Sequence, residues 1–195
     1  MKLAVIPRGA GTCIALNQQE PGEAPDRWYD FSAALQIYRQ IAEGVCGAEA
    51  TRIEELLSEG ILTSAYVSEV VRVLKHHSLM ELYWLEEAPE CFLLPFRPGK
   101  IIALGRNYLA HAAESGHDAP PEPIIFSKSP TACIADGDPI VVRPEYGRVD
   151  HEAELAVVIG RRARDLSEDD AQQYIAGYTL LNDVTAREMQ KADID

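Results

Sequence analysis

The most informative segment of this 195-residue chain is VDHEAELAVVIG, residues 149–160. Its apolar run, residues 155–159, is rich in β-branched side chains, which is typical of a buried strand. Two glutamates, Glu152 and Glu154, precede the run. Because side chains alternate between the faces of a strand, the two carboxylates are predicted to share one face, with Cα atoms about 7 Å apart.

Two carboxylates this close at the end of a buried strand repel each other and lose hydration, and a divalent cation removes that cost. A set of oxygen ligands suits Mg²⁺ or Mn²⁺, with Ca²⁺ as a further candidate, and does not suit zinc. The alternative is a pair of acids on a solvated strand end. Taken alone, the Glu-x-Glu pattern favours this alternative.

A second acidic position follows another strand-like stretch. The segment YTLLNDVTARE, residues 178–188, runs into Asp183, and Thr185 and Glu188 have the spacing of a capping box, so a helix is expected to begin there. Asp183 would then lie at a strand-to-helix turn. A metal ligand and an ordinary helix cap agree equally well with this spacing.

A third group of polar residues lies in GRNYLAHAAE, residues 105–114, after a predicted strand at 101–104. On a helix, His111 and Glu114 are neighbours on one face, and a carboxylate beside an imidazole makes a general base. A surface His–Glu pair is the alternative, and the spacing alone favours it. Arg106 could bind a substrate carboxylate through its two-pronged guanidinium, or a local carbonyl.

Composition excludes several classes of function. With 18 basic and 31 acidic residues the net charge is −13, which disfavours nucleic acid as a partner. The chain lacks an apolar run of about 18 residues, so no membrane span is expected. Four cysteines without a CxxC pair, in a chain without an export signal, predict reduced thiols in a cytoplasmic protein.

The expected fold class is α+β. Residues 1–94 form a mainly helical domain, with a strand-like segment from residue 1 to about 16 (a strand at 2–6, then a glycine-rich turn) and helices near 31–43, 49–58 and 63–77. The proline-rich segment 86–100 marks the boundary. Residues 95–195 are expected to be mixed, with strands at 101–104, 124–126, 139–142 and 152–159 and a helix from Ser167 to about 175 that Gly177 ends.

Four segments, taken in order, resemble the fumarylacetoacetate hydrolase family. They are KIIALGRNYLAHAAE (100–114), PIIFSKSPTACI (123–134), VDHEAELAVVIGRRARDL (149–166) and YIAGYTLLNDVTARE (174–188). The resemblance is closer to the bacterial-type branch of acylpyruvate hydrolases, oxaloacetate decarboxylases and hydroxyheptadienedioate isomerases. It covers about residues 95–195, and the first 90 residues show neither an assignable resemblance nor the small barrel of the fumarylacetoacetate hydrolases proper.

The resemblance implies a mixed β-roll, usually in a homodimer, in which Glu152, Glu154 and Asp183 bind Mg²⁺ or Mn²⁺. The implied reaction is metal-dependent cleavage of a C–C bond in a small 2-oxo acid or 1,3-dicarbonyl acid such as an acylpyruvate, by hydrolysis or decarboxylation. Isomerisation of the hydroxyheptadienedioate type is an alternative. A catalytically inactive remnant that acts in binding or dimerisation is another.

The same resemblance makes His111 and Glu114 the water-activating dyad and places Arg106 near the substrate carboxylate. Lys128 lies within a matched segment without an assigned role. The family also uses a lysine about twenty residues beyond the metal-binding aspartate, whereas this chain ends twelve residues after Asp183, and Lys191 is too close. We therefore expect a truncated roll with uncovered strand edges and apolar faces, and poor activity of this chain.

Overall fold

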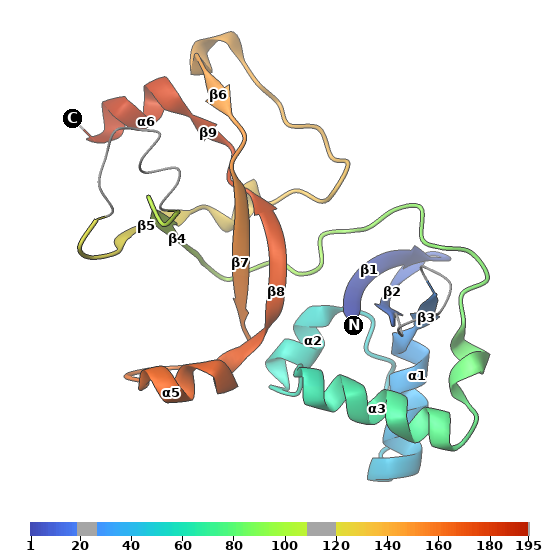
Figure 1. Ribbon diagram of the computed structural model, residues 1–195. Coiled ribbons are helices and arrows are strands. Elements are labelled where there is room, and N and C mark those ends of the chain that lie inside the picture. Colours follow the sequence, from blue (N-terminus) through green and yellow to red (C-terminus); the bar gives the residue numbers. More distant parts are fainter. Residues whose placement is uncertain (19–26, 109–119, 195) are drawn as a thin grey trace.

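A three-stranded antiparallel sheet begins the chain (Figure 1). β1 (Lys2–Arg8) pairs with β2 (Gly11–Asn17), and β2 pairs with β3 (Trp28–Asp30). The computed structural model describes residues 1–18, 27–108 and 120–194. The strand-like character expected from residue 1 to about 16 is confirmed by β1 and β2, whereas β3 was not predicted.

Helices share one apolar core with this sheet, and the first of them packs directly against it. They are α1 (Phe31–Tyr38), which continues as the π-helical η1 (Arg39–Glu43), α2 (Ile53–Ser58), α3 (Ser64–His76) and the 3-10 turn η2 (Met80–Tyr83). Asp30 caps α1 and Thr63 caps α3, each side chain accepting a hydrogen bond from the backbone N–H three residues later. The helices predicted near 31–43 and 63–77 are confirmed, whereas the one expected from residue 49 begins only at Ile53.

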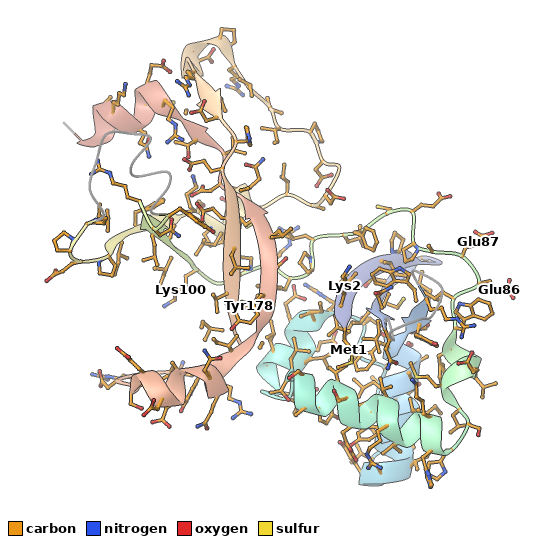
Figure 2. All side chains as sticks on the ribbon, viewed as in Figure 1. Met1, Lys2, Glu86, Glu87, Lys100 and Tyr178 are labelled. Atoms are coloured by element: carbon orange, nitrogen blue, oxygen red, sulfur yellow. The ribbon has the colours of Figure 1, made fainter. Side chains whose placement is uncertain are left out.

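The core of this region lies between α1, α3 and the sheet. The apolar stripe of α3 is buried along its whole length and consists of Val67, Val70, Val71 and Leu74. Figure 2 shows densely packed side chains here. The largest side chains with under 2% exposure include Phe31, Ile14, Leu16, Leu35, Leu56, Leu74 and Val70.

Residues 84–100 connect the two halves without a helix of their own. Trp84 forms an isolated bridge to Tyr29, and Leu93 forms one to Val5. The backbone N–H of Leu93 donates to the Val5 carbonyl at 2.8 Å. The predicted boundary segment therefore follows the first sheet before β4 begins.

Three antiparallel strand pairs lie in the described parts of the second half of the chain. β4 (Ile101–Gly105) pairs with β5 (Ile124–Lys128), β6 (Val149–Asp150) with β9 (Thr185–Ala186), and β7 (Ala153–Ile159) with β8 (Ile175–Asn182). The helical elements are η3 (Pro130–Ala132), η4 (Pro144–Tyr146), α5 (Glu168–Ala171), η5 (Gln172–Tyr174) and α6 (Arg187–Ile194). None of the helices in the described ranges is long and apolar enough to cross a membrane.

Two local predictions in this half are wrong. Residues 139–142 form no strand, and Ile140, Val141 and Val142 are half or more exposed, because no strand in the described part of the chain pairs with them. Ser167 caps α5 through the Asp170 N–H, as expected. Gly177, however, lies inside β8, so the helical stretch ends before it, at η5.

The apolar run of β7 is not a buried strand. Its residues Leu155, Val157 and Ile159, with Tyr178 and Leu180 of β8, are between 48% and 86% exposed on one face. Figure 2 shows Tyr178 on this ribbon, far less covered by side chains than the N-terminal helices. The expected burial is therefore wrong for this face, whereas the expected uncovered apolar face is present.

Cys13 gives a prediction about thiol reactivity. All four cysteines carry free thiols, but Cys13 is fully buried on β2, and this burial raises the pKa of its thiol to about 11. Because the thiolate is the nucleophile, we expect iodoacetamide at pH 8 to alkylate Cys13 about 100-fold or more slowly than the exposed Cys46 and Cys91. Mass spectrometry of timed samples measures this, with urea-unfolded protein as the control. Equal labelling rates in the native protein would contradict the buried position of Cys13.

Candidate metal centre

The pairing of β7 with β8 determines where the acidic residues lie. Glu152 lies just before β7 and Glu154 lies within it. Both are partly buried whereas Ala153 and Leu155 are exposed, so both glutamates share one face, as predicted. Asn182 ends β8 and accepts a hydrogen bond from the Glu152 N–H at 2.9 Å through its side-chain Oδ1. The Asp183 N–H donates to the Glu152 carbonyl at 2.8 Å. The strand pairing therefore brings Asp183 beside Glu152.

Asp183 is a buried acid. It is 6% exposed, and its Oδ1 forms an ion pair with the Lys128 ammonium at the end of β5. Within the described residues this contact lacks hydrogen-bond geometry, so Oδ1 is held by the ion pair. The Lys128 ammonium instead donates to the Val184 carbonyl at 3.3 Å. A buried carboxylate requires a compensating positive charge, and the Lys128 ammonium supplies it in this structure.

Glu152 is held by Arg187, the first residue of α6. One Arg187 nitrogen pairs with Glu152 Oε1, and its Nε donates to Asp150 Oδ2 at 2.8 Å. The Thr185 Oγ1 lies 3.0 Å from both Glu152 Oε2 and the Asp183 carbonyl oxygen. Arg187 and Thr185 therefore define the orientation of the Glu152 carboxylate.

The predicted capping box of Thr185 and Glu188 is wrong. Thr185 lies in β9. Its hydroxyl lies within hydrogen-bond distance of the Glu152 carboxylate and the Asp183 backbone carbonyl, and it caps no helix N–H. The Glu188 carboxylate accepts instead from the Arg148 backbone N–H. Asp183 is consequently no helix cap, which removes one of the two interpretations that its spacing left open.

Asp150 is a member of the cluster that the sequence analysis missed. Hydrogen bonds from the guanidinium groups of Arg148 and Arg187 hold the pKa of Asp150 at about 2. The signal was present, because Asp150, Glu152 and Glu154 alternate along one strand direction and period-2 spacing assigns all three to one face. Arg187 had no such signal, since only the fold brings α6 to β6.

The remaining predicted residues are less defined. Arg106 follows β4 with a left-handed φ of 55°, is exposed, and has no ion pair within the described ranges. Two residues later, the Tyr108 hydroxyl accepts a hydrogen bond from the Leu155 N–H at 3.2 Å and attaches this segment to β7. His111 and Glu114 lie outside the described residues.

The acidic residues fit a hard divalent cation in part. Glu152 and Asp183 are adjacent and supply only oxygen ligands, and Asp183 Oδ1 is a buried acceptor that the Lys128 ammonium neutralises. Glu154 lies on the same face, without an ion pair in the described part of the chain. Across residues 1–18, 27–108 and 120–194, no three acidic, His or Cys side chains are arranged to hold a metal ion. A shared ion would therefore require these carboxylates to exchange their present partners.

Comparisons with a family model and with known proteins find similarity to fumarylacetoacetate hydrolase-type proteins. Residues 100–194 match the family described as "Fumarylacetoacetate (FAA) hydrolase C-terminal". The chain is 38% identical over 137 residues to "Oxaloacetate tautomerase FAHD2A, mitochondrial" of Bos taurus, covering 70% of this chain and 41% of that protein. It is 51% identical over 96 residues to "Fumarylacetoacetate hydrolase domain-containing protein 2 homolog" of Dictyostelium discoideum, covering 49% and 32%. The matched region thus spans less than half the length of these relatives.

Solved structures extend the likeness to the whole chain. A fumarylacetoacetate hydrolase from Exiguobacterium antarcticum aligns over 100% of this chain and 60% of its own, with a TM-score of 0.63 at 21% identity. The 5-carboxymethyl-2-hydroxymuconate delta-isomerase of Mycobacterium smegmatis aligns over 100% and 59%, with a TM-score of 0.61 at 28% identity. The α+β class is confirmed. The first 90 residues also align with this fold. The expectation that they show no resemblance in sequence is wrong, because the match of 137 residues to the bovine protein is longer than the 105 residues beyond residue 90.

Proposed function

Because residues 100–194 belong to the fumarylacetoacetate hydrolase family, we propose that this chain is part of a divalent-metal-dependent enzyme acting on small 2-oxo acids or 1,3-dicarbonyl acids. The proposed ligands of Mg²⁺ or Mn²⁺ are Glu152, Glu154 and Asp183. The observation that carries the proposal is the buried carboxylate of Asp183 beside Glu152, which needs a positive charge and has Lys128 as its counter-ion in the described chain. We further propose that the second half forms the first part of a β-roll and that the protein is a homodimer.

A bound divalent cation polarises a carbonyl group and stabilises the negative charge of an enolate. The residues of the chain supply the rest. His111, with Glu114 orienting its imidazole, takes a proton from a water molecule that attacks the remote carbonyl. The C–C bond then breaks, and its electron pair leaves with the enolate fragment. Arg106, exposed and without a described ion pair, is available for the substrate carboxylate.

Proton transfer without cleavage of a C–C bond is the second candidate reaction. The bovine relative is an oxaloacetate tautomerase, and the M. smegmatis structure is that of an isomerase. In such a reaction His111 would move a proton between carbon and oxygen of the same substrate, and no water would attack. The candidate metal centre serves both reactions equally, so product analysis has to separate them.

Thermal unfolding tests the site independently of turnover. We expect Mg²⁺ and oxalate together to raise the melting temperature of the chain more than either does alone, because oxalate binds a site that the cation completes. Glu152→Gln should abolish this rise. Glu122→Gln is the matched control, since Glu122 is exposed and outside the cluster. If neither ligand shifts the melting temperature, the metal site is wrong and a non-catalytic binding role is favoured.

Substrates then distinguish the reactions. With Mg²⁺, an acylpyruvate split into pyruvate and a carboxylic acid indicates a hydrolase. Oxaloacetate converted to pyruvate and CO₂ above the metal-only background indicates a decarboxylase. Faster keto–enol exchange of oxaloacetate without loss of carbon, followed by NMR, indicates a tautomerase.

A further inference from the structure

Lys128 connects the β4–β5 hairpin to the candidate metal centre. It is the last residue of β5, and its ammonium reaches the turn after β8, where it pairs with Asp183 Oδ1 and donates to the Val184 carbonyl. The Lys128 side chain is 31% exposed and that of Asp183 is 7% exposed. One flexible, partly hydrated cation therefore neutralises one buried carboxylate.

Arg187 does the same for Glu152, but it is anchored differently. Besides Glu152, its guanidinium binds Asp150 at 2.8 Å and Gln190 Oε1 at 3.1 Å. These contacts would keep Arg187 in place if Glu152 turned away. Lys128 has one carboxylate and one carbonyl partner within the described ranges, and its Asp183 contact is an ion pair without hydrogen-bond geometry.

We propose that Lys128 is the internal counter-ion of the metal-free centre, and that a divalent cation displaces its ammonium from Asp183. The inference rests on the proposed function. Asp183 and Glu152, which lie side by side, each have a side-chain cation: Lys128 pairs with Asp183, and Arg187 pairs with Glu152 and is shared with Asp150. Of the two, the lysine can leave, because its long stem lets the ammonium turn to water while the stem stays packed. Metal binding therefore has to break one ion pair, and the affinity is lowered accordingly.

Lys128→Met tests this, because Met keeps an apolar stem and removes the charge. We expect the variant to bind Mn²⁺ about tenfold more tightly, since a competing positive charge at Asp183 is gone. In EDTA its melting temperature should fall, because Asp183 is then buried without a counter-charge. For a counter-ion, the Mn²⁺ affinity rises while the melting temperature in EDTA falls. For a residue that only supports the fold, both the affinity and the melting temperature would fall.

Isothermal titration calorimetry measures the affinities, with Mn²⁺ or Mg²⁺ titrated into protein that has been stripped of metal with EDTA. Lys100→Met is the matched control, because Lys100 is exposed just before β4 and has no ion pair within the described chain (Figure 2). Lys128→Arg keeps the charge and should restore the melting temperature in EDTA without tighter binding. This variant also covers the case in which Lys128→Met fails to fold.

The outcomes separate the two claims. If the wild type binds Mn²⁺ and Lys128→Met binds it with equal or lower affinity, the counter-ion is wrong while the metal centre stands. If neither protein binds Mn²⁺ or Mg²⁺, the proposed function fails and the inference fails with it. Binding by Lys128→Met alone would support the displacement most directly.

Discussion

Asp183→Asn is expected to weaken Mg²⁺ binding by about 100-fold or more while the chain still folds. Replacing groups that merely hydrogen-bond to metal ligands costs about 10–100-fold in affinity, and the loss of a charged ligand costs at least as much. Asn keeps the shape of the side chain at this buried position. Lys128, its partner, is partly exposed, so its ammonium can be solvated, and we expect a loss of only about 1 kcal/mol in unfolding free energy.

Titration with Mg²⁺ and thermal unfolding in EDTA measure the two quantities separately. Asp136→Asn is the control, because Asp136 is exposed in a turn away from the cluster. Wild-type affinity for Mg²⁺ in Asp183→Asn would remove Asp183 from the ligand set. A collapse of stability in EDTA with no change in affinity would instead make Asp183 a structural acid that needs Lys128.

The sequence predicted those elements whose signals are local. The α3 helix carries its own start signal in Thr63 and its own buried stripe, so its position follows from residues within one helix. The same holds for Ser167, whose hydroxyl caps α5. The shared face of Glu152 and Glu154 follows from strand geometry alone.

The wrong predictions concern partners that lie far away in sequence. An apolar run such as residues 139–142 becomes a strand only if another strand pairs with it, and the described chain provides none. Gly177 ends no helix, because pairing with β7 extends β8 through it. Thr185 has the spacing of a cap, but pairing with Asp150 draws it into β9, where its hydroxyl meets Glu152.

The candidate metal centre likewise combines residues that the sequence could predict with residues that only the fold brings to it. Its acids could be selected by type and spacing, but their positively charged partners could not. Lys128 lies 55 residues before Asp183, and Arg187 lies 35 residues after Glu152. Only β5 and α6, brought to the ends of β8 and β7 by the fold, place these charges on the carboxylates.

Leu74→Ala should give the largest loss of stability in the N-terminal region. Leu74 is fully buried at the end of the α3 stripe and packs into the core formed with α1 and the β1–β3 sheet. Truncating a buried leucine removes its transfer free energy and leaves a cavity, so we expect a loss of about 3 kcal/mol in the free energy of unfolding. Urea denaturation followed by fluorescence of the two tryptophans measures it.

Leu82→Ala is the matched control, because it makes the same chemical change at a side chain that is 72% exposed in η2. We expect a change within about 0.5 kcal/mol there, as for most surface substitutions. Similar losses in both variants would mean that α3 does not pack into the core as described. A large loss in Leu74→Ala with unchanged Mg²⁺ affinity in the folded variant would show that the N-terminal core stabilises the chain without shaping the candidate metal centre.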